Sequence, residues 1–400
     1  MNTLRIRGIS AFFIVLFAAV GIAWSSAGAS AGPNRSAALP AKAHQHAFLT
    51  AISFSSGQDG WVAGHTMSHG YIFHTTNSGK SWTRRTVGWA AEQLQFINAS
   101  DGWAVVENPA RCGAGTSPPR TACLWAIVST HDAGNSWALQ LNGGACWQIS
   151  SMDFITNQEG WAIESNSPCI HGNQKVKTKI VVTTNGGGTW QIAFQPSQRV
   201  TSVHFGAPLN GWAAADGLTG GKVDHCKTIM YDKSDRGQTW GEQLFVSGYC
   251  SGQVDFVNAR DGWLFVTNVG ACSMNGCFDN RLYRTTNGGN QWTIEQQTHA
   301  GKPLWSGSCG FLQQPHFTGP NTGYVPVSAG PSCPSGGIDI TRDGGRHWVR
   351  KQPRGFQVSD LSPVSTADVW AIGCAERTLD CTHVLHTTDA AHSWGQLRVD

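Results

Sequence analysis

Four polar residues that could bind a ligand or transfer protons each lie directly before a phenylalanine, and they recur at intervals of roughly fifty residues. They are Asp153, His204, Asp255 and His316. Ser53, Gln95 and Asp360 take the same position in other repeats, so the seven side chains would form a polar ring wherever the repeats converge. Such a ring could hold a cation or a sugar, or it could be the hydrogen-bonded wall of a water-filled channel.

Catalysis at this ring would need two carboxylates on either side of one bond. Asp153 and Asp255 lie two repeats apart and could face each other, but the sequence does not fix their separation. The chain contains no Gly-x-Ser-x-Gly nucleophile motif and no phosphate-binding loop. We therefore predict no catalytic residue, no metal site and no cofactor, and we favour a binding function over an enzymatic one.

The elements that position these residues belong to a repeat with two alternating motifs. The first is a short apolar segment that ends in Phe and leads into an Asp-Gly-Trp-like turn, with the turn aromatic seven residues after the Phe. These pairs are Phe54 and Trp61, Phe96 and Trp103, Phe154 and Trp161, Phe205 and Trp212, Phe256 and Trp263, and Phe317 and Tyr324. In the seventh repeat we assign the Phe position to Leu361, nine residues before Trp370.

The second motif is a Thr-x-Asp-x-Gly-x-x-Trp box, clearest in Thr75 to Trp82. Its acidic or amide position is occupied by Asn77, Asp132, Asn185, Asp235, Asn287, Asp343 and Asp389. Lys233 replaces the Thr in the fourth box, and Ala391 replaces the Gly in the last. We expect the Asp or Asn to bond backbone amides two residues on, the Gly to be left-handed and the Trp to cover the turn.

Both motifs are turns between strands, because Asp-Gly between apolar runs favours a hairpin and the box joins two runs rich in strand formers. Each repeat reads as strand A, Asp-Gly turn, strand B, variable loop, strand C, box turn and strand D. Seven such units predict an all-β, seven-bladed β-propeller of four-stranded antiparallel blades over residues 48–400. The predicted blades are about 48–90, 91–144, 145–197, 198–248, 249–300, 301–354 and 355–400.

The box resembles the Asp-box, or BNR, repeat. Together with Gly-Trp-Ala and Thr-Thr-Asn-Gly-Gly, as at Thr183 to Gly187, it most resembles propellers of the photosystem II assembly-factor type and their uncharacterised bacterial relatives. That resemblance implies a structural role for every box, and a role for the chain in holding another protein, such as a membrane complex, outside the cytoplasm. The twelve cysteines and long loops depart from the pattern, so a photosynthetic role is not predicted.

The same box occurs in sialidases and xyloglucan-active hydrolases, so a glycan-binding or glycoside-hydrolase propeller is the alternative. Sialidases of the known families need three arginines, a Tyr paired with Glu, and an acidic Asp, and they usually carry Arg-Ile-Pro near their start. This chain has no Arg-Ile-Pro, and Tyr231 and Tyr283 have no Glu close by in sequence. The residues therefore favour the protein-binding reading.

Twelve cysteines, an even number, predict a disulfide framework in an exported protein. All of them fall between strands B and C or between strand D and the next strand A, two loop classes that emerge on the same face. Pairing of sequence neighbours would join Cys112 to Cys123, Cys146 to Cys169, Cys226 to Cys250, Cys272 to Cys277, Cys309 to Cys333 and Cys374 to Cys381.

Loops that are held by disulfides at one end of a rigid fold are favourable places for a binding site. Trp147, Trp305 and Arg111 lie on this loop face, and exposed Trp and Arg are frequent anchors of protein interfaces. The alternative for each Trp is that it caps the end of a blade. We predict a protein partner, with a glycan as the second possibility.

The N-terminal residues predict export. Residues 1–29 combine Arg5 and Arg7 with an apolar stretch and small residues, which is typical of a signal peptide or an uncleaved anchor, and residues 30–47 read as a linker. Only 13% of the residues are charged and no basic run occurs, which argues against nucleic acid as a partner. We expect a secreted or envelope-located monomer that meets a membrane only if the signal segment is retained.

Overall fold

The computed structural model describes most of the chain from residue 46 onward, and every structural statement below concerns these residues alone. They are 46–66, 69–107, 125–143, 147–166, 176–207, 210–218, 226–233, 239–249, 251–268, 279–297, 311–312, 315–328, 336–376 and 380–399. Within them no helix is long and apolar enough to span a membrane. Arg111, Trp305, Asp235 and nine of the predicted disulfide cysteines lie outside them.

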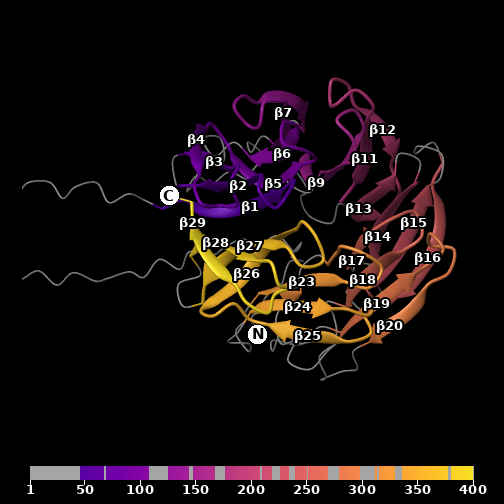
Figure 1. Cartoon of the computed structure of the whole chain (residues 1–400). Helices are drawn as coiled ribbons and strands as arrows, with labels where there is room; N and C mark the ends of the chain where they lie inside the picture. Colours follow the sequence, from indigo (N-terminus) through magenta and orange to yellow (C-terminus); the bar gives the residue numbers. More distant parts are fainter. Residues whose placement is uncertain are drawn as a thin grey trace, which may run out of the picture. The chain divides into compact units, whose positions relative to one another are not determined.

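The described residues form seven antiparallel sheets, each built from strands that are consecutive in sequence. Figure 1 shows the sheets following one another in chain order from β1 to β29. This confirms the predicted fold class, a seven-bladed β-propeller whose box turns join strands C and D.

The strands of the first four blades have the following bounds. Blade 1 contains β1 (Phe48–Phe54), β2 (Gly60–His65), β3 (Gly70–Thr75) and β4 (Thr83–Val87). Blade 2 contains β5 (Ala90–Phe96), β6 (Gly102–Glu107), β7 (Trp125–Thr130) and β8 (Ala138–Asn142). Blade 3 contains β9 (Gln148–Phe154), β10 (Gly160–Ser165), β11 (Thr178–Thr183) and β12 (Gln191–Phe194). Blade 4 contains β13 (Arg199–Ala207), β14 (Asn210–Leu218), β15 (Cys226–Lys233) and β16 (Gly241–Ser247).

The last three blades follow the same plan, except that strand A of blade 6 is divided in two. Blade 5 contains β17 (Ser251–Phe256), β18 (Gly262–Asn268), β19 (Asp279–Thr285) and β20 (Thr293–Gln297). Blade 6 contains β21 (Phe311–Leu312) and β22 (His316–Phe317), which both pair with β23 (Gly323–Ser328), and then β24 (Gly337–Thr341) and β25 (Trp348–Lys351). Blade 7 contains β26 (Phe356–Pro363), β27 (Val369–Ala375), β28 (Cys381–Thr387) and β29 (Gly395–Arg398).

The ring closes by packing of the first blade on the last. No strand of one blade completes the sheet of another, and β1 packs against β26, β27 and β28. Two hydrogen bonds join the same blades, from Ile52 N to Asp360 Oδ2 at 3.0 Å and from Phe54 N to Ser362 Oγ at 2.8 Å. Closure therefore rests on side-chain packing and on polar side chains that bond the neighbouring backbone.

The aromatic residues of the two motifs form the joint between neighbouring blades. The turn Trp of one blade stacks on the strand A Phe of the next, as Trp212 does on Phe256 with ring centroids 3.5 Å apart. The same stack joins Trp61 to Phe96, Trp103 to Phe154, Trp161 to Phe205, Trp263 to Phe317 and, across the closure, Trp370 to Phe54. The turn tryptophans are almost fully buried, so the motif that is clearest in the sequence is also the core of the ring.

The box turns have a hydrogen-bond pattern that differs in one respect from the prediction. Asn77 Oδ1 accepts from Ser81 N at 2.9 Å, four residues on, whereas we expected amides two residues on. The Thr hydroxyl provides an acceptor for a buried backbone N–H of the turn, because Thr75 Oγ1 accepts from Gly79 N at 2.9 Å. Gly79 has φ of 73°, which confirms the expected left-handed glycine.

Blade 7 corrects the assignment of its strand A. Ser362 pairs with Trp370 just as Ser53 pairs with Trp61, so Pro363 occupies the Phe position, seven residues before Trp370. The assignment of Leu361 was wrong because blade 7 has no large apolar side chain in the Phe position. A Pro is tolerated at this strand end, where its missing N–H interrupts no further ladder bond. The ring residue of blade 7 is therefore Ser362, and Asp360 lies two residues before it in β26.

Candidate functional site

The ring predicted from the sequence lies on the inner strands. Asp153, His204, Asp255 and His316 each pair with the turn aromatic of their own blade. Strands A of neighbouring blades contact one another at β1 and β5, β5 and β9, β9 and β13, and β13 and β17. The structure therefore brings these residues to equivalent positions around the axis of the propeller.

The side chains of this ring bond the backbone of the next blade. Asp153 Oδ2 accepts from Phe205 N at 2.8 Å, and Asp255 Oδ2 accepts from Phe317 N at 2.6 Å. Uncharged members make the same bond, from Phe96 N to Ser53 Oγ, from Phe154 N to Gln95 Oε1 and from Phe54 N to Ser362 Oγ. An acid, an amide and a hydroxyl share one task, which is to satisfy a buried N–H where two blades meet.

The charged members of the ring also interact with one another. His204 Nδ1 lies 3.5 Å from Asp255 Oδ1. Burial raises the pKa of Asp153 above its ordinary value, and the nearby His204 opposes that shift. Burial lowers the pKa of His316, against the attraction of Asp255. Among the described residues no three such side chains are arranged to hold a metal ion.

A second tier of inter-blade bonds lies further along the inner strands. Gln93 Oε1 accepts from Met152 N at 2.9 Å, and Ser202 Oγ accepts from Val254 N at 3.2 Å. Asp360 belongs to this tier through its bond from Ile52 N. Burial raises the pKa of Asp360 to about 7, against the effect of its backbone hydrogen bonds.

The loop face is described only in part. Cys374 and Cys381 form a disulfide between β27 and β28, as the sequence-neighbour pairing expects. Trp147 is half-buried just before β9, with Lys179 Nζ 4.6 Å from the centre of its ring. Lys179 also pairs with Glu164 at 2.9 Å, so this Trp lies in a polar network at the end of its blade.

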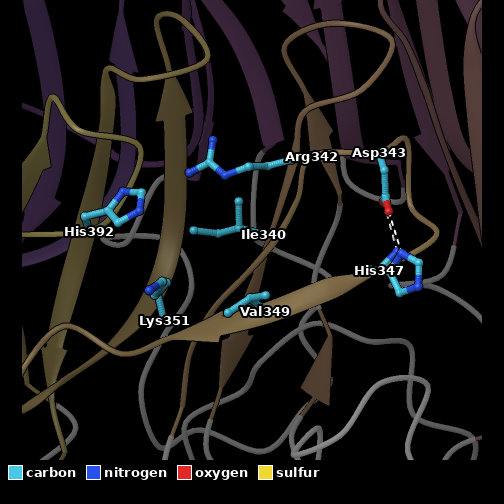
Figure 2. Close-up of a pocket in the computed structure, with 7 residues that line it drawn as sticks. All are labelled: Ile340, Arg342, Asp343, His347, Val349, Lys351 and His392. Atoms are coloured by element: carbon cyan, nitrogen blue, oxygen red, sulfur yellow. Dashed lines mark hydrogen bonds and ion pairs between the residues drawn. The ribbon is translucent and has the colours of Figure 1, made fainter.

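A groove that was not predicted from the sequence lies between the outer strands of blade 6 and the box turn of blade 7. Figure 2 shows its lining, which comes from β24, β25 and the box turns of blades 6 and 7. The cavity has a volume of about 290 Å³ and is lined by Ile340, Arg342, Asp343, His347, Val349, Lys351 and His392.

The floor of the groove is apolar because blades diverge outward. Ile340 on β24 is 4% exposed, whereas its cross-strand neighbour Val349 on the outer strand β25 is 57% exposed. Inner strands are covered by the next blade, but the outermost strand extends beyond that cover. A wedge of apolar surface is therefore left open to solvent between the two blades.

The rim of the groove is cationic. Asp343 is the single acid of the lining, and His347 Nδ1 lies 2.6 Å from Asp343 Oδ2. Burial opposes the shift, but the hydrogen bonds with His347 lower the pKa of Asp343 below its ordinary value. Arg342 donates from Nη2 to Ala390 O at 3.2 Å, and neither Arg342 nor Lys351 pairs with a carboxylate of the described residues. Figure 2 shows Arg342, Lys351 and His392 around Ile340 and Val349, with His347 turned away toward Asp343.

The repeats give a signal that could have located this groove. The residue after the box Thr is Arg only in blade 6, and blade 6 alone combines it with a cation three residues after the box Trp. Positions with a structural role stay the same from blade to blade, as the Trp and Phe of the motifs do. A cluster that departs from the repeat at the surface points instead to a role of its own.

The described strands, the ring residues and the box turns together define a seven-bladed β-propeller. No protein-family model matches the sequence, and no curated protein matches it. Among solved structures the propeller is similar to YCF48 from Cyanidioschyzon merolae, with a TM-score of 0.56 and 14% identity over 88% of this chain and 98% of that one.

Two further solved structures have the same fold. One is YCF48 bound to D1 peptide, with a TM-score of 0.53 and 16% identity over 86% of this chain and 92% of the other. The second is a polysaccharide lyase, an ulvan lyase, with a TM-score of 0.54 and 9% identity over 88% and 96%. At these identities the likeness is one of fold, and it covers both a peptide-binding and a glycan-active protein.

Proposed function

We propose that the chain is an exported, non-catalytic propeller that binds a partner protein through its disulfide-held loop face and helps to assemble or stabilise a complex of the cell envelope. The observation that carries this proposal is the use of the ring acids. Asp153 and Asp255 each accept a backbone hydrogen bond from the next blade, which gives both carboxylates a structural task. A glycosidase in the channel would need them free to act on a substrate.

The comparisons support the same choice. A fold shared with YCF48 bound to D1 peptide makes a polypeptide ligand compatible with this architecture. The fold shared with the ulvan lyase keeps the glycan reading as the competitor. The described part of the loop face favours a binding surface, because Trp147 lies there only half-buried and the Cys374–Cys381 disulfide holds one of the loops.

The test is a photo-crosslinking experiment on the purified chain, with the crosslinker placed near Trp147. The chain is incubated with its own envelope fraction, once with its disulfides oxidised and once after they are reduced. A glycan array is run in parallel. We expect a single polypeptide to crosslink, and Trp147→Ala and reduction to weaken the crosslink, while Arg84→Ala on the outer strand of blade 1 leaves it unchanged. Glycan binding that is lost in Asp153→Asn, which keeps the structural acceptor, would establish the glycan reading instead.

A further inference from the structure

We propose that the groove between blades 6 and 7 is a second binding site, for an extended peptide segment with an aliphatic and an acidic residue two positions apart. It rests on the proposed function only in that the ligand is a polypeptide. Its location differs, because the groove lies at the outer rim beside the box turns and not at the loop face.

The first argument is charge. Arg342, Lys351 and His392 face a groove whose only acid already has His347 as its partner. Within the described chain the guanidinium of Arg342 donates one hydrogen bond, to Ala390 O, and its other N–H groups have no partner there. A carboxylate that enters this groove meets two cations without displacing a carboxylate of the described chain.

The second argument is shape. Among the described strands the outer strand β25 has one neighbour, β24, so its other edge is not paired with any of them and can accept a further strand. An extended peptide can add to such an edge by backbone hydrogen bonds, while alternate side chains give specificity. Val349 and Lys351 are two residues apart on β25 and therefore point to the same face. An aliphatic residue next to Val349 and an acid next to Lys351 would match them.

The third argument is that no other blade has two aliphatic and two cationic residues at the four positions of the groove. The positions of Ile340, Arg342, Val349 and Lys351 are His74, Thr76, Thr83 and Arg85 in blade 1, and Arg284, Thr286, Thr293 and Glu295 in blade 5. Blade 5 even places an acid where blade 6 has Lys351. Folding explains Arg342 in part, because blade 6 has Tyr324 in place of the turn Trp and Arg342 donates to Ala390 O, the box position that Trp212 Nε1 reaches at Gly288 O between blades 4 and 5. It does not explain Val349 and Lys351, which have no such counterpart in the other blades.

The experiment measures binding of synthetic peptides to the full chain. Fluorescein-labelled octapeptides with a central Leu-Thr-Asp or Asp-Thr-Leu are titrated at low ionic strength and followed by anisotropy, since a strand can add in either direction. Matched peptides carry Asn for Asp or Ser for Leu. We expect saturable binding of at least one acidic peptide, with affinity about tenfold lower for its Asn and Ser counterparts.

Variants of the chain separate this site from other basic surface. Arg342→Ala with Lys351→Ala should reduce affinity at least about tenfold, and Val349→Ser should reduce it with the charges intact. Arg84→Ala is the matched control, because Arg84 is an exposed cation on the outer strand of blade 1, and it should bind normally.

Three outcomes would overturn the proposal. They are the absence of saturable binding, affinity that the groove variants leave unchanged in folded protein, and displacement of the peptide by inorganic phosphate at the peptide's own concentration. Failure of the wild-type chain to crosslink a polypeptide near Trp147, with intact peptide binding at the groove, would instead count against the proposed function, so the two failures can be told apart.

Discussion

The inner ring and the blade 6–7 groove both contain ionisable side chains, yet they differ in whether those side chains already have charged or backbone partners. Ring acids such as Asp153 and Asp255 accept hydrogen bonds from a neighbouring blade, and Asp255 also faces His204. In the groove Arg342 and Lys351 have no carboxylate partner within the described chain. The ring therefore holds the blades together, whereas the groove offers charge to something outside the molecule.

The largest expected effect concerns Asp360, whose pKa burial raises to about 7. The pKa in the unfolded chain is about 3.9, so the folded protein binds the proton more tightly. Its contribution to the free energy of unfolding is therefore complete below about pH 4 and is lost as the pH rises through about 7. Relative to Asp360→Asn, the wild type should lose on the order of 3 kcal/mol between about pH 5 and 8.

Urea unfolding of both proteins across this pH range measures the difference. The Asn variant is the control, because it keeps an acceptor for Ile52 N but does not titrate. A difference between the two proteins that stays constant with pH would show that Asp360 is not held protonated by the fold.

The next effect concerns the ring itself. Asp255→Ala should lower the free energy of unfolding by about 2 kcal/mol, because Phe317 N is left buried without an acceptor. Asp255→Asn keeps an acceptor and should lose less. Chemical denaturation at pH 7 decides between the roles, since a ligand-binding Asp255 with no structural task would give stability equal to that of the wild type.

Much of this fold is visible in the sequence because packing repeats with the motifs. The Trp and Phe that stack between blades were identifiable because the turn aromatic follows the strand A Phe of its own blade by seven residues, as Trp263 follows Phe256. Trp263 then stacks on Phe317 of the next blade. The inter-blade bonds were not, because Ser53 and Asp153 share no chemistry beyond an acceptor oxygen. The strand register of blade 7 was missed because Pro363 is not aromatic, although its spacing from Trp370 was correct.

The groove was hidden for a different reason. Its cations are visible in the sequence, but their lack of carboxylate partners depends on how far the blades diverge at β25. The exposure of Val349 could not be predicted either, because a valine in a predicted strand is ordinarily expected to be buried. Val349 is 57% exposed because of its place on the outermost strand. Comparing blades position by position recovers the cluster, but only the structure shows that it is open.

A third prediction tests whether the divergence of blades 6 and 7 is partly structural. Gly289 of box 5 lies against Trp212, and an added Cβ would be 3.4 Å from its ring nitrogen. Blade 7 has Ala391 in that position and blade 6 has Tyr324 in place of Trp, and the two share one core cluster. A methyl group at this distance is in ordinary contact with a Trp ring, whereas Tyr324 makes a bond that a Trp lacks, from Oη to Thr366 O at 2.7 Å.

Tyr324→Trp should therefore reduce the free energy of unfolding by about 1 kcal/mol through loss of the hydrogen bond to Thr366 O. Adding Ala391→Gly should recover little of that loss, so the two substitutions should be additive to within about 0.5 kcal/mol. A larger coupling in the double-mutant cycle would mean that steric compensation links these two departures from the repeat.

The smallest expected effect on stability sharpens the comparison most. Lys351→Ala should change the free energy of unfolding by less than about 0.5 kcal/mol, because this side chain has no carboxylate partner within the described chain. Arg342→Ala should cost about 1 kcal/mol, because it also removes the hydrogen bond to Ala390 O. Together the two substitutions are expected to weaken peptide binding at least about tenfold. The ring substitutions should show the opposite pattern, with lower stability and unchanged peptide affinity in protein that remains folded. If the groove variants unfolded as easily as Asp255→Ala, their cations would be part of the fold, and the distinction between the two regions would be lost.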